Sequence, residues 1–374
     1  MKNYVLDARS AINHFPGIGR YVSNLAQAMV PQLANDERLV LLIDSSRPSR
    51  WQLPAQSGRG VQWVETAVSP FSLSQQWHIP RLLKQLGADV YHSPYYLMPY
   101  APGVPTVLTF YDLIPQFFPQ YSSFRARLFV RQTTRLALRT AYQIIAISEA
   151  TRRDLLAHYP VPSERVTTVS LAADPHFQLQ SAVEMARVRQ KYDLPTRYVL
   201  YLGSNKPHKN LLNLIKGWAL LDTDVTLVIA GSWNNQYPQA KEAAAAVNKR
   251  IIFLGTVDEN DLPSLYARAT VFVFASLYEG FGLPVIEAMA CGTAVACSNT
   301  FSLPEVGGDA VAYFDPAKPQ EIATILQHLL QDDSYRDGLR EKGLIQARKF
   351  SWEKTAVSTL QIYRQTHEAI IARN

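Results

Sequence analysis

Hydrophobic residues recur in short runs along the first half of the chain, and amphipathic stretches separate these runs. Runs rich in β-branched and aromatic residues predict buried strands, whereas apolar positions with a period of about 3.6 residues predict helices. The predicted strands are residues 4–8, 39–43, 61–65, 90–92, 106–110 and 143–147. The predicted helices are residues 20–33, 75–86, 124–142 and 149–158. Strands that alternate with helices indicate a parallel, doubly wound sheet.

The same alternation returns in the second half of the chain after an interruption. Between residues 172 and 196 the pattern fades, and Pro175 and Pro195 flank a polar middle. Further strands are predicted at residues 198–203, 225–230, 251–254, 271–275 and 294–297, and further helices at 285–290, 321–350 and 352–372. We therefore predict an α/β protein with two Rossmann-like, doubly wound domains, at residues 1–180 and 197–350. A linker at 181–196 joins them, and a last helix follows at 351–374.

Composition and charge narrow the class of protein. The 374 residues are 47% hydrophobic and 18% charged, which is normal for a globular enzyme of more than one domain. A net charge of +6 is too mild to indicate nucleic acid as a partner. Two cysteines, Cys291 and Cys297, are too few for a disulfide framework and favour a reducing compartment. No apolar run approaches the ~20 residues of a membrane span, and the first apolar strand is too short for a signal sequence. We expect a cytoplasmic protein.

The stretch that carries most chemistry follows the predicted strand at 271–275. Gly280 and Gly282 end the strand, Pro284 lies where a helix would begin, and Glu279 and Glu287 flank the turn. A helix N-terminus offers unpaired N–H groups and a partial positive charge, and glycines let a ligand approach the backbone. This combination suits a phosphate, with the two carboxylates accepting hydrogen bonds from sugar hydroxyls. Each glutamate alone is also explained as a loop residue or a helix cap, but the whole pattern is more specific.

Other candidates lie in loops that follow predicted strands. Gly17 and Gly19 belong to a loop at 13–19, and a dinucleotide-binding G-x-G-x-x-G motif is disfavoured because its third glycine would fall at Val22. His92 and Asp112 end two strands, where ligands of doubly wound sheets bind, although a structural role for His92 is equally open. Ser148 also ends a strand, and we interpret it as a helix N-cap. Residues 203–210 form a second polar loop, which lacks P-loop spacing.

The segment from Tyr278 to Gly292 resembles the E-x7-E signature of retaining family 4 glycosyltransferases, which have the GT-B fold of two Rossmann-like domains with a cleft between them. The resemblance covers essentially the whole chain. It implies that Glu279 contacts the donor sugar of a nucleotide diphosphate-sugar and that Glu287 holds its ribose. It also implies that the backbone at Phe281, Gly282 and Leu283 lies against the sugar and diphosphate.

The resemblance assigns roles to the other loops as well. Residues 203–210 are similar to the family's G-x-x-x-P-x-K-N loop, in which Lys209 would meet the diphosphate and offset the charge of the leaving group. Many members have arginine where this chain has Ser204, and Lys206 is a candidate to compensate. By the same resemblance Gly203 belongs to this loop. The resemblance also implies that the loop with Gly17 and Gly19 faces the donor phosphates and the acceptor. It implies that the backbone near Thr256 and Val257 contacts the base. The last helix would cross back to the first domain.

Residues 89–94 and 111–115 also match family patterns, and they bring His92 and Asp112 into the candidate catalytic set with Glu279 and Lys209. Many members have His-Asp where this chain has Tyr111-Asp112. A role that needs an imidazole at that position is therefore not carried over to Tyr111.

The predicted helix at 124–142 is unusually basic. Arg127, Arg131, Arg135 and Arg139 recur every four residues, with Arg125 nearby and no acid among them. One interpretation is a membrane-facing helix, which would place the enzyme at the inner face of the plasma membrane. The alternative is a solvated helix face.

The resemblance implies a retaining hexosyltransferase that acts on a glycan or lipid-linked acceptor in polysaccharide biosynthesis, with UDP-glucose as the first candidate donor and GDP-mannose as the second. No Asp-x-Asp motif lies at a strand end, so we expect no metal and no other cofactor. The sequence also leaves two alternatives: a GT-B sugar-nucleotide epimerase, and a non-catalytic, membrane-docked protein that binds nucleotide-sugars. The intact set of Glu279, Glu287 and Lys209 argues against the second of these.

Overall fold

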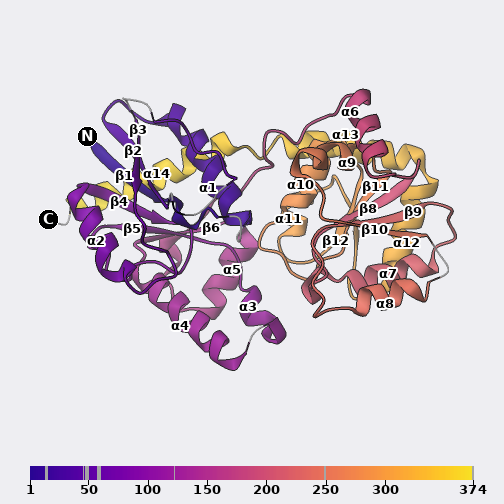
Figure 1. Cartoon of the computed structure of the whole chain (residues 1–374), viewed down its shortest axis with the longest axis horizontal. Helices are drawn as coiled ribbons and strands as arrows, with labels where there is room; N and C mark the ends of the chain where they lie inside the picture. The colour runs from indigo at the N-terminus through magenta and orange to yellow at the C-terminus, as the bar shows by residue number, and fades with distance from the viewer. Residues whose placement is uncertain are drawn as a thin grey trace. The chain divides into compact units, whose positions relative to one another are not determined.

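The computed structural model describes residues 1–12, 16–44, 46, 50–56, 60–121, 123–247 and 250–372. The chain forms two compact units, which we call unit 1 (Met1–Leu171 with Ser351–Asn374) and unit 2 (Ala172–Phe350). Figure 1 shows that the last helix, although it ends the chain, lies in unit 1 with the first strands. The stretch 181–196, predicted as a linker, lies within unit 2 and contains a helix, α6 (Ala182–Lys191).

Unit 1 is built on a parallel sheet with the strand order β3-β2-β1-β4-β5-β6-β7 in the part of the chain that the structure describes. Its strands are β1 (Lys2–Asp7), β2 (Glu37–Ile43), β3 (Val61–Glu65), β4 (Ala88–Ser93), β5 (Thr106–Phe110), β6 (Gln143–Ala146) and β7 (Val166–Thr168). Its helices are α1 (Pro16–Met29), α2 (Gln75–Gln85), α3 (Ile114–Phe117), α4 (Phe124–Thr140), α5 (Glu149–His158) and α14 (Trp352–Ile371).

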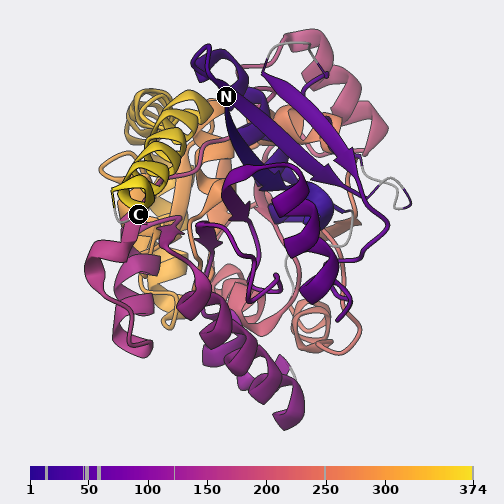
Figure 2. The same cartoon turned by 90° about the vertical axis from the view of Figure 1, so that its left-hand side faces the viewer.

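Alternate residues of the unit 1 strands pack against helices on opposite faces of the sheet. On one face Val5, Val40 and Tyr91 pack with α2, while strands β5 and β6 pack with α4 and α5. On the other face lie α1 and α14, as in Figure 2, where α14 is the yellow helix that ends at the C-terminus. There Tyr363 of α14 meets Tyr4 edge to face, with ring centroids 5.3 Å apart. Because strand residues point alternately to the two faces, a strand buried on both faces is apolar throughout, as the sequence runs are.

Unit 2 repeats the design with the strand order β10-β9-β8-β11-β12-β13, again parallel, among the described residues. Its strands are β8 (Tyr198–Leu202), β9 (Thr226–Ala230), β10 (Ile251–Gly255), β11 (Val271–Phe274), β12 (Val295–Ser298) and β13 (Ala312–Phe314). Besides α6, its helices are α7 (Leu211–Leu220), α8 (Gln239–Ala245), α9 (Leu262–Arg268), α10 (Leu283–Ala290), α11 (Leu303–Gly307), α12 (Pro319–Gln331) and α13 (Asp333–Ala347).

Several predicted elements need correction. Gly17 and Gly19 lie inside α1 and not in a loop, whereas residues 13–15 of the predicted loop fall outside the described part of the chain. The helical stretch 321–350 is two helices, because the Asp332 side chain accepts a hydrogen bond from the Tyr335 N–H at 2.8 Å and starts α13 anew. Pro284 is the second residue of α10 and not the first. The short strands β7 and β13 were not predicted.

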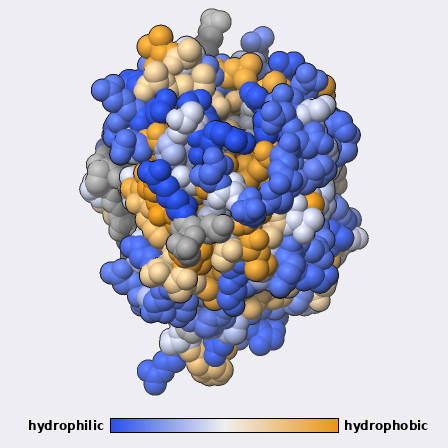
Figure 3. Space-filling model, turned by 90° about the vertical axis from the view of Figure 1, so that its right-hand side faces the viewer, coloured by the Kyte–Doolittle hydropathy of each residue, from blue (hydrophilic) through white to orange (hydrophobic). Residues whose placement is uncertain are grey.

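The surface agrees with a globular chain of this composition. Hydrophilic and hydrophobic residues are mixed on the face shown in Figure 3, without a continuous hydrophobic band. Within the described residues, no helix has the length and apolar content that a membrane-crossing segment requires.

Candidate active site

The glycine loop and α10 in unit 2 have the geometry that the motif predicted. β11 is fully buried, and the chain then turns at Gly282, whose φ of +115° is the left-handed region that favours glycine. A Cβ at this position would lie 2.7 Å from Leu303 Cδ2, so the Leu303 side chain would also have to move. Gly282 is the N-cap of α10 and has no side chain to offer to the first N–H groups of the helix. The start of α10 therefore presents backbone to a ligand.

The Phe281 side chain lies in the interior of unit 2 and is not available to a ligand. It is buried and packs edge to face on Phe350, with ring centroids 5.9 Å apart. This contact anchors the turn at the start of α10, next to the backbone that the resemblance places against the sugar and diphosphate.

Glu279 and Lys209 form an ion pair at this loop. Lys209 Nζ lies 2.7 Å from Glu279 Oε1, and the two side chains are only 21% and 12% exposed. Lys209 ends a short 3-10 helix, η5 (Pro207–Lys209), and its ammonium lies 5.4 Å from the centre of the Phe274 ring. The loops are also joined by their backbones, since the Leu277 N–H donates to the His208 carbonyl at 2.7 Å. Two loops 70 residues apart in sequence thus meet because β8 and β11 are neighbours in the sheet.

The other residues of the 203–210 loop divide into buried and exposed ones. Ser204 accepts a hydrogen bond through its carbonyl from the Tyr201 hydroxyl at 2.8 Å, while Lys206 is exposed. The Lys206 ammonium makes no hydrogen bond or ion pair to the residues that the structure describes, so its charge is available to a ligand. His208 is buried, and burial together with the charges of Lys209 and Lys206 lowers its pKa to about 3. His208 is therefore neutral at physiological pH, and the lysines supply the positive charge.

Gly203 takes part in a backbone contact that the sequence did not reveal. Its N–H donates to the Ala230 carbonyl at 2.9 Å, and Gly231 follows with a φ of +126°. A Cβ on Gly231 would lie 2.3 Å from the Gly203 carbonyl oxygen, so the loops after β8 and β9 can touch only through glycine. The Gly231 N–H in turn donates to the Gly255 carbonyl at 2.8 Å, which aligns the three strand ends.

Glu287 lies on α10, one turn and a half behind Gly282. It is 3% exposed, and Oε2 accepts a hydrogen bond from the Tyr266 hydroxyl of α9 at 3.1 Å. The phenol fixes the carboxylate, so Glu287 can present a lone pair to a ligand hydroxyl without first losing side-chain freedom.

Thr256 and Val257 follow Gly255, which has a φ of +71°. Thr256 is exposed and Val257 half-buried. The segment just after them is held by α6 and by Tyr192, the residue that follows α6. The Asp258 N–H donates to the Tyr192 hydroxyl at 3.2 Å, and the buried Asp261 accepts three hydrogen bonds from side chains of this region. These donors are Arg187 Nη2 at 2.6 Å, Lys191 Nζ at 2.6 Å and the Tyr192 hydroxyl at 2.8 Å.

This Asp261 cluster was missed by the sequence analysis. Burial alone would raise the pKa of Asp261, but the hydrogen bonds from Lys191, Arg187 and Tyr192 outweigh it and hold the pKa at about 2. Asp261 is therefore charged at physiological pH and ties α6 to the segment behind Thr256 and Val257.

In unit 1, His92 lies in a closed hydrogen-bond network. It is fully buried, with Nδ1 2.6 Å from the Tyr363 hydroxyl and Nε2 2.7 Å from Thr109 Oγ1. Thr109 Oγ1 also lies 2.9 Å from the Tyr21 hydroxyl. Burial lowers the pKa of His92 to about 3, so the ring is neutral. Both nitrogens are engaged within unit 1, and this geometry favours the structural role that the sequence left open.

Asp112, Tyr111 and Ser148 lie at the same edge of the unit 1 sheet. Asp112 is half-buried, and Oδ1 accepts from the Ile114 N–H at 2.9 Å at the start of α3. The buried Tyr111 hydroxyl makes no hydrogen bond to described residues, and burial raises its pKa well above 10. Ser148 accepts from the Thr151 N–H at 2.9 Å, which confirms the predicted N-cap of α5.

Gly17 and Gly19 differ in their surroundings. Gly17 is exposed in the first turn of α1 and has open space around it. Gly19 is buried, and a Cβ there would collide with the Trp51 ring. Gly17 therefore leaves α1 backbone accessible, whereas Gly19 is required for packing.

Comparison with known proteins decides the family. Residues 16–177 match the family Glycosyltransferase Family 4, and residues 184–345 match Glycosyl transferases group 1. The chain is 34% identical over 282 residues to O-antigen chain mannosyltransferase B of Escherichia coli, and the match covers 74% of each protein. The chain belongs to glycosyltransferase family 4. Another relative, the serotype-specific mannosyltransferase WbdA of Escherichia coli, is 35% identical over 225 residues, but the match spans only 27% of that longer protein.

Solved structures agree with this assignment at the level of the fold. A structure of Anabaena Alr3699/HepE in complex with UDP and glucose superposes with a TM-score of 0.74 at 18% sequence identity, covering 98% of this chain and all of that one. The predicted GT-B fold class is confirmed, and this family 4 glycosyltransferase places both parts of its signature, Glu279 and Glu287, in unit 2.

The basic helix of this glycosyltransferase is α4, which projects from unit 1 in Figures 1 and 2. Its arginines do not form one uniform stripe: Arg125, Arg131 and Arg139 are exposed, while Arg127 and Arg135 are half-buried. Four large apolar side chains of the same helix are also exposed. These are Phe124, Leu128, Phe129 and Leu136, with exposed fractions of 72%, 47%, 58% and 42%.

Proposed function

We propose that this glycosyltransferase moves a hexose, with mannose as the first candidate, from a nucleotide diphosphate-sugar to a glycan or lipid-linked acceptor in polysaccharide biosynthesis. The observation that carries the proposal is the Lys209–Glu279 pair beside the uncapped start of α10, with Glu287 behind it. The choice of mannose is supported by the names of the two relatives described above, an O-antigen chain mannosyltransferase and a serotype-specific mannosyltransferase. It moves GDP-mannose ahead of UDP-glucose, which was our first candidate from sequence.

The proposed roles follow from charge and position. Lys209, aided by Lys206 and the positive end of α10, offsets the negative charge that builds on the nucleoside diphosphate as it leaves. Glu279 accepts hydrogen bonds from hydroxyls of the transferred sugar, and Glu287 accepts them from the ribose. The charge that a metal ion would otherwise neutralise is then met by the chain itself, so we propose turnover without a metal.

We propose that the reaction retains the configuration of the sugar. The bond from C1 to the phosphate oxygen breaks, and a new bond from C1 to the acceptor oxygen forms on the same face. The acceptor proton passes to the departing phosphate, so that no residue is required as a covalent nucleophile. Proton NMR of the fresh product tests this, because retention yields the anomer of the donor and inversion the opposite one.

A panel of nucleotide-sugars tests the donor directly. The melting temperature of the full chain is measured with GDP-mannose, UDP-glucose, GDP and UDP at equal concentrations, since binding to the folded state raises it according to concentration over Kd. We expect GDP-mannose to give the largest rise. A larger rise with UDP-glucose would overturn the choice of mannose, and no rise with any member of the panel would overturn the proposed donor class.

An acceptor-dependence assay separates transfer from the alternatives. The donor is incubated with the enzyme, with and without a mannose-terminated oligosaccharide, and both the nucleotide and the sugar products are measured. A transferase gives elongated oligosaccharide in proportion to the nucleotide released. Conversion of the nucleotide-sugar to its epimer without acceptor would favour the epimerase instead.

We also propose that α4 attaches the enzyme to an anionic membrane at the inner face of the plasma membrane. Its exposed Phe124 and Phe129 can enter the headgroup region, while Arg125, Arg131 and Arg139 can meet lipid phosphates. Each basic residue near an anionic surface contributes about 1 kcal/mol, so three of them and the apolar groups suffice for reversible attachment.

Co-sedimentation with vesicles tests this attachment. We expect binding to vesicles with anionic lipid at low salt, weaker binding at high salt, and little binding to neutral vesicles. Replacing Arg125, Arg131 and Arg139 by Gln should abolish binding, whereas the same change at Arg127 and Arg135, which are half-buried, should weaken it less. Wild-type protein that stays in the supernatant at low salt would show that α4 is only a solvated helix.

A further inference from the structure

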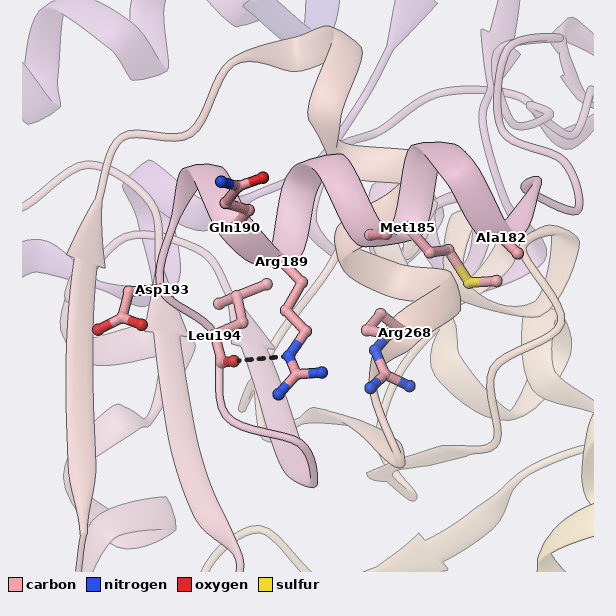
Figure 4. Close-up of a pocket in the computed structure, with 8 residues that line it drawn as sticks. Ala182, Met185, Arg189, Gln190, Asp193, Leu194 and Arg268 are labelled. Carbon is pink, nitrogen blue, oxygen red and sulfur yellow. Dashed lines mark hydrogen bonds between the residues drawn. The ribbon is translucent and has the colours of Figure 1, made fainter.

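A groove in unit 2 lies between α6 and the end of α9. It has a volume of about 470 Å³, and none of the candidate donor-binding residues lines it. Figure 4 shows Arg189 of α6 and Arg268, the last residue of α9, extending to the same side of the groove. Met185 and Leu194 lie beside them, and two alanines complete the apolar part of the wall.

The two guanidinium groups have no acidic partner among the described residues. Arg268 makes neither a hydrogen bond nor an ion pair there. Arg189 is fixed by neutral acceptors only, since Nε donates to the Leu194 carbonyl at 3.3 Å and Nη2 to Thr196 Oγ1 at 3.0 Å. Asp193 also lines the groove, but it is exposed, and in the view of Figure 4 its carboxylate points away from both arginines.

The contrast with the other cations of α6 is informative. Arg187 and Lys191 both lie 2.6 Å from the buried carboxylate of Asp261. The same helix thus neutralises two of its cations on the side that faces Asp261 and leaves Arg189 unneutralised in the groove. Two like charges that share a groove repel each other, and an anion between them would remove this cost.

We propose that this groove binds a small phosphate monoester with an apolar body. A planar guanidinium group can donate two parallel hydrogen bonds to two oxygens of a phosphate. A phosphate dianion can neutralise two guanidinium groups, whereas a carboxylate carries only one negative charge. The volume falls in the range of small-molecule sites, and the half-buried Met185 with the exposed Ala182 and Ala186 offers an apolar surface for the carbon part of the ligand. This inference does not depend on the proposed function.

Calorimetric titration of the full chain with phenyl phosphate tests the proposal. Excess GDP and UDP are present throughout, so that the diphosphate loop is occupied. We expect phenyl phosphate to bind more tightly than inorganic phosphate, benzyl alcohol not to bind, and salt to weaken the binding of phenyl phosphate.

Variants at the groove make the test specific. Arg268→Ala should weaken phenyl phosphate binding about tenfold or more, the loss expected for a charge-assisted hydrogen bond. It should change the melting temperature little, because the Arg268 side chain makes no hydrogen bond to the described residues. Arg268→Lys should recover part of the affinity, since charge returns without the planar fork. Arg348→Ala, which removes an exposed arginine of the same unit outside the groove, should change nothing.

Three results would overturn the proposal: no binding of phenyl phosphate at millimolar concentrations, equal affinity for wild type and Arg268→Ala, or loss of binding in Lys209→Ala. Either of the first two results would mean that Arg189 and Arg268 are solvated side chains without a ligand. The third result would mean that phenyl phosphate binds at the diphosphate loop. Phosphate monoesters occur as soluble metabolites and as lipid headgroups. Displacement of phenyl phosphate by vesicles with phosphatidic acid, but not by neutral vesicles, would support the lipid form of the ligand, and no displacement would support the soluble form.

Discussion

Replacing Glu287 by Gln separates the charge of this side chain from its shape. Gln has nearly the same volume and can still accept a hydrogen bond from the Tyr266 hydroxyl, which lies 3.1 Å from Glu287 Oε2. Glu287 is only 3% exposed, so water cannot take over the lost interaction. What the substitution removes is the charge of the acceptor that would meet the ribose.

The expected size of the effect follows from this geometry. A hydrogen bond to a charged group contributes about 1.5–3 kcal/mol, so the nucleotide Kd should rise about 10- to 150-fold. Tyr266→Phe keeps the carboxylate and removes one hydrogen bond that fixes it. A loss of about 0.5–1.5 kcal/mol, or about 2- to 13-fold in Kd, is expected for that variant.

Calorimetry with GDP and with its 2′,3′-dideoxy analogue gives the decisive comparison. For GDP the Glu287→Gln penalty should be large. For the analogue it should nearly vanish, because no ribose hydroxyl remains to be bound. An equal Kd for wild type and Glu287→Gln, or the same penalty with both nucleotides, would refute the ribose assignment, and the melting temperature of each variant identifies a loss of folding.

Further predictions concern the rest of the site and the fold. Lys209→Ala should lower kcat, because its charge matters most as the diphosphate leaves; an unchanged kcat/KM would remove it from the mechanism. Glu279→Gln should lower kcat strongly with little change in the Kd of the free nucleotide, and a comparable loss of nucleotide affinity would contradict its place on the sugar. Turnover should continue in EDTA, and loss of activity that Mg²⁺ or Mn²⁺ restores would contradict metal independence. A prediction on stability concerns Glu37, whose pKa falls from 4.5 to about 2 because hydrogen bonds from Arg364 outweigh burial. The charged Glu37 therefore contributes at most about 3 kcal/mol to the free energy of unfolding. This contribution is present above pH ~5 and is lost as the pH falls towards 2. Glu37→Gln should remove this pH dependence from the free energy of unfolding, and an unchanged acid branch would refute it.

The repeated strands and helices could be predicted from sequence because their signal is local. β3, β5 and α5 have the predicted bounds: β5 is buried throughout, the edge strand β3 carries β-branched and aromatic residues, and Ser148 caps the start of α5. The short β7 lacks an apolar run, because two of its three residues are threonines and only one residue is buried. β13 ends the apolar stretch 310–314, which our prediction did not assign to a strand. α6 was missed because it is mostly exposed, so its apolar period is weak.

The glycine loop and the two glutamates of the site could be identified from the motif, but not their partners. The Lys209–Glu279 pair depends on β8 lying beside β11, and strand order in a sheet is a property of the whole unit. For His92 the motif gave its position at a strand end, and only the packed α14, which brings Tyr363 to Nδ1, shows that the ring is enclosed.

The Asp261 cluster could not be predicted from the local sequence pattern. Its donors lie 69 to 74 residues earlier in the chain, in a stretch whose weak pattern suggested a linker. A linker would leave the loop at Thr256 and Val257 to be positioned by β10 alone. The three hydrogen bonds instead make α6 part of the support of that loop, because the energetic penalty for burying Asp261 is compensated only while Arg187, Lys191 and Tyr192 stay in place. The helix thus supports the loop that we expect to contact the base, and the same placement brings Arg189 to the groove beside Arg268.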